Sequence, residues 1–274
     1  MGIRLIALDL DGTLLNEKMH VSEKTRAVME QCAQRGIEIV PATGRALPAV
    51  PEEVLGLSGV HYGIFTNGAS VRDFKKEIWV AEHCLSWEET IGIIEVLRQY
   101  PVIYDMYVSG GGVSETGLLA QLEAYGIPER ECAYIRETRR AVEDMAAYLQ
   151  ERKCPVQKMN LNFKDRETKL AVRKKLEGMP EVLVTSSLPW NLELNAAGVA
   201  KGSGLRDLWR YLGIKAEETM AFGDGENDWS MLEAAGIGVA MENGAPFLKE
   251  RADRIAGSNR EDGVAEAIRK WVLI

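Results

Sequence analysis

The stretch that decides the fold is residues 3–15, IRLIALDLDGTLL. Its apolar run predicts a buried strand, and side chains alternate along a strand, so Asp9 and Asp11 leave it on the same side. Two carboxylates this close repel each other by about 4 kcal/mol at an effective dielectric of about 20 and a separation of about 4 Å. A cation, a proton or a lysine must offset that repulsion, and each of these can take part in catalysis. Gly12 then allows a sharp turn, so the stretch predicts a strand that delivers two acids to a functional site.

The bulk composition is that of an ordinary globular protein. The chain has 274 residues, of which 46% are hydrophobic and 27% charged, and this length predicts two domains. The net charge of −8 argues against a nucleic-acid partner or an anionic membrane surface, but it leaves room for small anionic substrates at a local positive site. The four cysteines and three histidines are scattered, and no apolar run approaches the length of a membrane span. The first residues run straight into a predicted strand, so we expect no signal peptide. We therefore expect a cytoplasmic protein with reduced thiols and no membrane partner.

The order of the expected elements indicates a parallel sheet with crossover helices. Short apolar runs alternate with amphipathic segments, which is typical of doubly wound α/β proteins. Outside the middle of the chain we expect strands near 37–40, 62–65, 192–194, 219–222 and 237–241, a hairpin over 69–80, and helices at 201–212 and 263–272. Ligands of such sheets bind at the carboxyl ends of the strands, where the candidate motifs fall.

The middle of the chain has its own pattern. We expect helices near 87–99, 115–125, 139–151 and 165–177, strands near 102–108, 156–163 and 181–186, and a loop at 110–112. The economical fold is a doubly wound core domain built from residues 1–83 and 188–274. A second α/β domain, residues 84–187, is inserted into it.

A second acid-rich strand end lies at 223–228, GDGEND. Asp224 directly follows an apolar strand and is the strongest candidate to share a divalent cation with Asp9 and Asp11. Hard cations of the magnesium type prefer such oxygen ligands. Asp228 begins a helix, where it is either a capping residue or a further metal ligand.

The sequence predicts anion binding at two further places. Thr43 and Gly44 follow a strand and lead into a helix, so a hydroxyl and free backbone N–H groups can receive a phosphate there. Lys201 opens a helix, where its charge opposes the helix dipole, and a neighbouring anion would account for it.

These motifs together resemble those of the haloacid dehalogenase superfamily. Within that superfamily the chain is similar to the Cof-like phosphatases, which carry a large α/β cap inserted in the core. The four matching motifs are 9–14 (DLDGTL), 41–45 (PATGR), 201–202 (KG) and 223–228 (GDGEND), in the family's order and spacing. The chain departs from the usual pattern at 240–244 (AMENG) and at 195–200 (NAAGVA), outside the motif cores.

The resemblance implies a role for each acid. Asp9 would attack phosphorus and become an aspartyl phosphate, which is nucleophilic catalysis. Asp11 would protonate the leaving oxygen and later accept a proton from water. Mg²⁺ would be held by Asp9, by the backbone carbonyl of Asp11 and by Asp224.

The same resemblance implies which groups bind the phosphate. Thr43, the Gly44 N–H, Lys201 and Asn227 would contact its oxygens, and Asp228 would orient Lys201 or a metal-bound water.

The implied function is that of a Mg²⁺-dependent phosphatase. Its partners would be small phosphorylated metabolites, either sugar phosphates or nucleotide- and cofactor-derived phosphates, with the inserted domain selecting the leaving group. Two alternatives remain open: a phosphosugar mutase that uses the same aspartyl phosphate, and a phosphate-binding regulator without turnover. The sequence does not indicate an oligomeric state.

Overall fold

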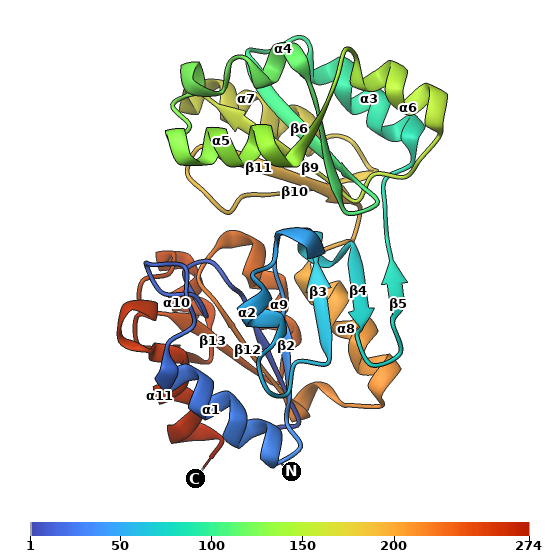
Figure 1. The fold of residues 1–274 in the computed structure, drawn as a ribbon. Coiled ribbons are helices and arrows are strands. Elements are labelled where there is room, and N and C mark those ends of the chain that lie inside the picture. Colours follow the sequence, from blue (N-terminus) through green and yellow to red (C-terminus); the bar gives the residue numbers. More distant parts are fainter. Residues whose placement is uncertain (1, 274) are drawn as a thin grey trace. The chain divides into compact units, whose positions relative to one another are not determined.

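The chain divides into two compact units, and the computed structural model describes residues 2–273 of it (Figure 1). Unit 1 is built from both ends of the chain, up to Glu82 and again from Val199 onward, whereas unit 2 is the continuous segment His83–Gly198. Among the described residues, no helix has the length and apolar character needed to cross a bilayer.

Unit 1 contains a five-stranded parallel sheet with β1 next to its centre. The strand order is β14-β13-β12-β1-β2. The strands are β1 (Leu5–Leu8), β2 (Glu38–Pro41), β12 (Thr219–Gly223), β13 (Ile237–Met241) and β14 (Arg254–Ala256). Leu8 lies in register with Phe222 on one side and Pro41 on the other, so the carboxyl ends of three strands meet at one edge.

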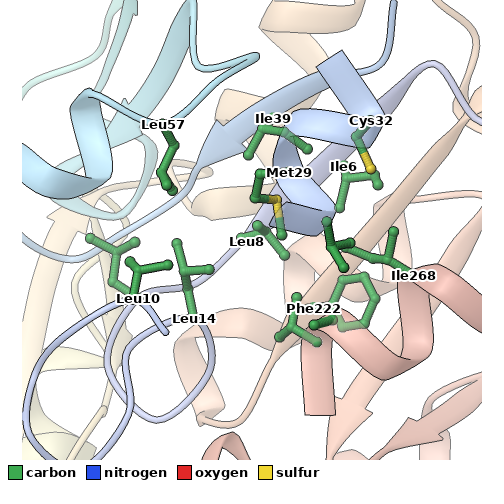
Figure 2. Packing of buried hydrophobic residues seen from close by; sticks show 14 of the residues in the cluster. Ile6, Leu8, Leu10, Leu14, Met29, Cys32, Ile39, Leu57, Phe222 and Ile268 are labelled. Carbon is green, nitrogen blue, oxygen red and sulfur yellow. The ribbon is translucent and has the colours of Figure 1, made fainter. Parts of the chain in front are cut away.

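Helices cover both faces of this sheet. They are α1 (Glu23–Gln34), α2 (Glu52–Leu55), α8 (Lys201–Leu212), α9 (Trp229–Ala234), α10 (Pro246–Arg251) and α11 (Gly263–Trp271). Ile6 and Leu8 of β1 pack with residues of α1 and α11, as Figure 2 shows for Met29 and Ile268. The alternate residues of β1 pack with α8 and α9 on the opposite face. The sequence prediction of a doubly wound α/β core is therefore confirmed.

A second, antiparallel sheet lies beside the first. It has the order β3-β4-β5, formed by β3 (Tyr62–Phe65), β4 (Ser70–Asp73) and β5 (Ile78–Glu82). The predicted hairpin is β4–β5. Strand β3 was expected in the main sheet, but only isolated bridges, such as that from Ala42 to Ile64, connect this segment to the segment of β2. The short helical turn η2 (Thr66–Gly68) follows β3.

Unit 2 is a six-stranded sheet with helices α3, α6 and α7 packed through one shared apolar core. Its strands, in the order β10-β11-β9-β6-β7-β8, are β6 (Val102–Val108), β7 (Gly111–Glu115), β8 (Arg139–Val142), β9 (Lys158–Phe163), β10 (Val182–Thr185) and β11 (Asn191–Ala196). Its helices are α3 (Trp87–Leu97), α4 (Thr116–Leu119), α5 (Glu129–Thr138), α6 (Met145–Arg152) and α7 (Arg166–Leu176).

Three sequence predictions in this region are wrong. Strand β11, which we assigned to the core domain, pairs antiparallel with β9 and β10, so the second boundary lies at Gly198 rather than at residue 187. Residues 111 and 112 of the predicted loop belong to strand β7, where they pair with β6. Glycine is required at position 112, because a Cβ there would lie 2.1 Å from the Arg139 side chain. The helix expected from residue 139 begins only at Met145, because residues 139–142 pair with β7 as an edge strand.

Candidate active site

Three carboxylates meet where β1 and β12 end. Asp9 directly follows β1 and Asp224 directly follows β12, and adjacent parallel strands bring their carboxyl ends to the same edge. Asp228, at the start of α9, joins them. One oxygen from each of the three side chains lies within 4.8 Å of the others. The pair predicted from the sequence, Asp9 and Asp224, is thus brought together with a third acid.

A buried lysine links two of these acids. Lys201 is the first residue of α8, and its side chain is fully buried. Its Nζ lies 2.6 Å from Oδ1 of Asp9 and 2.6 Å from Oδ1 of Asp228. Burial alone would lower the pKa of Lys201, but the two carboxylates outweigh it and the pKa is raised. Lys201 therefore stays charged, as the sequence-based expectation of a neighbouring anion requires.

The remaining oxygen of Asp228 holds the loop after β12. Its Oδ2 accepts hydrogen bonds from the backbone N–H groups of Asp224, at 2.9 Å, and Gly225, at 2.8 Å. Both oxygens of Asp228 are therefore in use within the protein, which fits the role of orienting Lys201.

The acids of this cluster carry more charge than Lys201 offsets. Burial and then Asp228 raise the pKa of Asp9 well above its ordinary value. The same two causes, in the same order, raise the pKa of Asp224 to about 6. One ammonium faces three carboxylates, and the donor set consists only of oxygens, which is the set that a hard divalent cation prefers.

The turn after β1 is shaped around Asp224. Gly12 has a φ of +85°, and a Cβ there would lie 2.5 Å from Oδ2 of Asp224. Thr13 donates a hydrogen bond of 2.8 Å from its hydroxyl to Oδ1 of the same carboxylate. Gly12 allows the turn and leaves room for the Asp224 carboxylate, and Thr13 holds that carboxylate in place.

The carboxylate of Asp11 lies outside the three-acid cluster. Arg45 donates to both of its oxygens, from Nε at 2.8 Å and from Nη2 at 2.6 Å. About half of the Asp11 side chain is exposed. Asp11 was predicted from the sequence, whereas a role for Arg45 was not.

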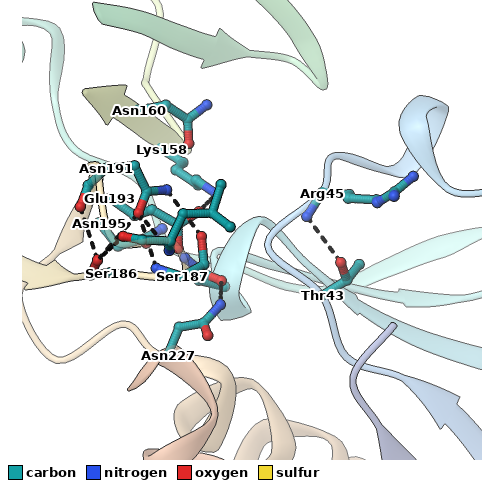
Figure 3. Close-up of polar contacts among 12 residues, drawn as sticks. Thr43, Arg45, Lys158, Asn160, Ser186, Ser187, Asn191, Glu193, Asn195 and Asn227 are labelled. Carbon is teal, nitrogen blue, oxygen red and sulfur yellow. Dashed lines mark hydrogen bonds and ion pairs between the residues drawn. The ribbon is translucent and has the colours of Figure 1, made fainter. Parts of the chain in front are cut away.

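The expected phosphate-binding residues follow strands β2 and β12, which flank β1, or begin helix α8. The buried hydroxyl of Thr43 accepts a hydrogen bond from the backbone N–H of Arg45 at 3.1 Å, which closes a turn around Gly44 (Figure 3). Asn227, in the loop after β12, is buried, and its Nδ2 lies 3.3 Å from Oδ1 of Asn67.

Asn67 connects these groups and was missed by the sequence analysis. Its backbone N–H donates to the carbonyl of Thr43 at 3.0 Å, while its side chain accepts from Asn227. The residue is buried and has a φ of +59°, a conformation that asparagine tolerates better than most residues. Asn67 follows β3. The expectation that functional residues lie at the carboxyl ends of strands, which identified Asp9, would therefore have identified Asn67 too.

Comparisons with known proteins assign the chain to a family. The haloacid dehalogenase-like hydrolases match residues 6–268 of the chain. The chain is 29% identical over 273 residues to 5-amino-6-(5-phospho-D-ribitylamino)uracil phosphatase YcsE of Bacillus subtilis, covering 100% of this chain and 97% of the relative. It is 30% identical over 274 residues to pyridoxal phosphate phosphatase YbhA of Escherichia coli, covering 98% of each.

The fold comparison agrees. A solved haloacid dehalogenase-like hydrolase from B. subtilis superposes with a TM-score of 0.84 at 28% identity, covering 97% of this chain and 99% of that one. The sequence-based recognition and the fold class are thus confirmed. The chain belongs to the haloacid dehalogenase-like hydrolases, among relatives that are phosphatases of small phosphorylated metabolites.

Proposed function

We propose that the chain hydrolyses phosphate monoesters of small metabolites with Asp9 as the nucleophile. The observation that carries this proposal is the buried contact of 2.6 Å between Asp9 and Lys201 beside two further acids. The ammonium holds one carboxylate oxygen in place and offsets its charge, so that the other oxygen can approach phosphorus. A protein that only bound phosphate would have no use for a carboxylate at this point, because it would repel the ligand.

The chemistry then runs in two steps. An oxygen of Asp9 forms a bond to phosphorus while the bond from phosphorus to the leaving oxygen breaks, and Asp11 supplies the proton that this oxygen takes up. Water next attacks the phosphorus of the aspartyl phosphate and gives a proton to Asp11, while the bond from phosphorus to the Asp9 oxygen breaks. Inorganic phosphate then leaves and free Asp9 is restored. Arg45 sets the position from which the Asp11 carboxylate acts.

The donor set fits Mg²⁺. Asp9, the backbone carbonyl of Asp11 and Asp224 would hold the ion, and Gly12 leaves the space beside Asp224 free of a side chain. When bound, Mg²⁺ supplies positive charge that offsets the repulsion between the nucleophile and the phosphate.

Thr43, the Gly44 N–H, Lys201 and Asn227 would bind the non-bridging phosphate oxygens. The bonds of Asn67 to both Thr43 and Asn227 support this assignment, because they tie two of these groups to one buried residue. Groups held in this way are positioned before the substrate arrives, and phosphoryl transfer depends chiefly on such positioning.

The substrates that we propose are sugar phosphates or nucleotide- and cofactor-derived phosphates. Two relatives support this class by name, since one acts on a phosphoribitylamino-uracil and the other on pyridoxal phosphate. We propose further that unit 2 is the cap that selects the leaving group.

The deciding experiment measures hydrolysis of p-nitrophenyl phosphate with Mg²⁺, with a chelator, and with the variant Asp9→Asn. Asp207→Asn, in the middle of α8, is the matched control. We expect turnover that needs both Mg²⁺ and Asp9, and brief quenched incubation should leave a phosphoryl group on the peptide that contains Asp9. Unchanged turnover in Asp9→Asn would exclude Asp9 as the nucleophile.

A further inference from the structure

Unit 2 carries a groove between helix α7 and the loop that precedes β11. The groove has a volume of about 410 Å³, and we call it the α7 groove. Arg166, Lys169, Leu170 and Arg173 of α7 line one side, and Trp190 belongs to the other. Clefts of a few hundred Å³ are the size that proteins use to bind small molecules.

Large apolar side chains are exposed at this groove. Among the described residues seven large hydrophobic side chains are exposed, and two of them line this groove: Leu170 at 52% and Trp190 at 40%. A third, Leu188 at 42%, belongs to the loop that carries Trp190. Helix α7 already buries Val172 and Leu176 in the core of unit 2, so Leu170 is not needed for that packing. Exposed apolar side chains that gather in one place mark a binding surface more often than isolated ones do.

The loop that presents Trp190 is held firmly by polar contacts. Lys169 donates from Nζ to three oxygens: Ser186 Oγ at 3.0 Å, the Leu188 carbonyl at 3.3 Å and the Pro189 carbonyl at 2.9 Å. All three N–H donors of this ammonium therefore have an acceptor in the loop.

Asn191 anchors the same loop from its other end. Its Oδ1 accepts from the backbone N–H groups of Ser187, at 3.2 Å, and Leu188, at 2.8 Å, while its Nδ2 donates to Ser187 Oγ at 3.0 Å (Figure 3). A loop fixed by this many bonds loses little entropy when a ligand binds. The apolar surface of Trp190 is thus held in position before a ligand binds.

The charge of the α7 groove is positive. Arg166, Lys169 and Arg173 repeat along one stripe of α7 at helical spacing. Arg173 is paired with Glu177, whereas no carboxylate among the described side chains pairs with Arg166. The groove's one acid, Asp165, caps α7 by accepting from the N–H and the hydroxyl of Thr168, which holds the pKa of Asp165 below its ordinary value.

We propose that the α7 groove binds a small anionic molecule with a planar ring. The ring would lie against the indole of Trp190 and the side chain of Leu170, and the anionic group would be bound by the guanidinium of Arg166. A guanidinium presents two parallel donors to a phosphate or carboxylate, and an indole offers a flat apolar face to a ring. This site involves none of the acids around Asp9 and does not rest on the proposed function.

The test is calorimetric titration of the full chain with 3′,5′-cyclic AMP. This probe carries a planar ring and a negative charge but no terminal phosphate for a phosphatase to remove. We expect saturable binding that weakens about tenfold in Trp190→Ala and in Arg166→Ala. Lys169→Met should weaken binding by a similar factor although it leaves both contact residues in place, because the loop loses its anchor and the groove loses a positive charge.

Trp79→Ala is the matched control, since Trp79 lies in unit 1 and is 39% exposed, almost as much as Trp190. It should leave the affinity unchanged, and the thermal unfolding of every variant is measured to confirm that it is folded. Adenosine, which has the ring without the charge, should bind about tenfold more weakly than cyclic AMP. Undetectable binding at millimolar cyclic AMP, or equal affinity in Trp190→Ala and the unchanged chain, would overturn the proposal.

Discussion

The guanidinium of Arg45 binds the carboxylate of Asp11 at both oxygens, with contacts of 2.8 Å and 2.6 Å. The same guanidinium donates to the Ala49 carbonyl at 3.0 Å, so Arg45 itself is anchored. The side chain of Asp11 therefore has a defined position although it is half exposed and separate from the acids at Asp9. A paired fork of this kind is specific to arginine, because lysine offers a single point charge.

We predict that Arg45→Lys lowers kcat about tenfold for an alkyl phosphate and much less for p-nitrophenyl phosphate. In the proposed mechanism an alkoxide takes up a proton from Asp11 as it leaves, whereas p-nitrophenolate leaves without one, and proton donation contributes about 10²–10⁴-fold to a rate. Steady-state kinetics on both substrates measure the difference. Equal losses on the two substrates would show that Arg45 acts on folding or binding instead.

We predict that Lys201→Met destabilises the protein by about 3–5 kcal/mol, because it leaves the buried carboxylates of Asp9 and Asp228 without their cation. Urea unfolding measures the loss. The double variant Lys201→Met/Asp228→Asn should recover part of it, since one uncompensated charge is then removed as well. A double variant that is no more stable than the single one would contradict this electrostatic account.

We predict that Mg²⁺ stabilises the protein more at about pH 7.5 than at about pH 5. The pKa of Asp224 is raised from 3.8 to about 6, first by burial and then by Asp228. A carboxyl group with a raised pKa stabilises the fold while it is protonated, and this contribution is complete below about pH 4 and lost as the pH rises through about 6. Mg²⁺ offsets the charge that appears there, so the increase in melting temperature with Mg²⁺ should grow across this interval. The variant Asp224→Asn should lose most of that growth, and a pH-independent increase would contradict the prediction.

We predict that Gly12→Ala abolishes activity, whereas Gly36→Ala costs only about 1 kcal/mol of stability. Both glycines have a left-handed backbone, with φ of +85° and +73°. A Cβ at Gly36 meets nothing within 4 Å, but one at Gly12 would lie 2.5 Å from the Asp224 carboxylate. Both variants place an alanine in a left-handed backbone conformation, but only Gly12→Ala brings the new Cβ against the Asp224 carboxylate. Active Gly12→Ala protein would show that Asp224 can move without loss of function.

The sequence was sufficient to predict the residues that sheet geometry alone brings together. Asp9 and Asp224 each follow an apolar run, and parallel pairing of those runs places both acids at one edge. Lys201 was predictable because a lysine at a helix start needs a nearby anion. The contact between Arg45 and Asp11 was not predictable, since it depends on side-chain rotamers rather than on the pattern of apolar residues along the chain.

The errors in unit 2 have a related cause. The alternation in Asn191–Ala196 correctly indicates a strand, but it carries no information on which sheet the strand joins. Gly112 is a strand residue that must be glycine, because the side chain of Arg139 takes the space of a Cβ. A contact between residues so far apart in the sequence leaves no local signal, so the run of glycines resembles a loop.

The insertion of unit 2 between the two parts of unit 1 has a consequence for synthesis on the ribosome. Strand β1 pairs with β12, which begins at Thr219, so the main sheet cannot be completed before the ribosome has passed that residue. The continuous segment His83–Gly198 is complete before that. Unit 2 can therefore fold before the main sheet of unit 1 is complete, and β1 has only β2 as a pairing partner until β12 has been made.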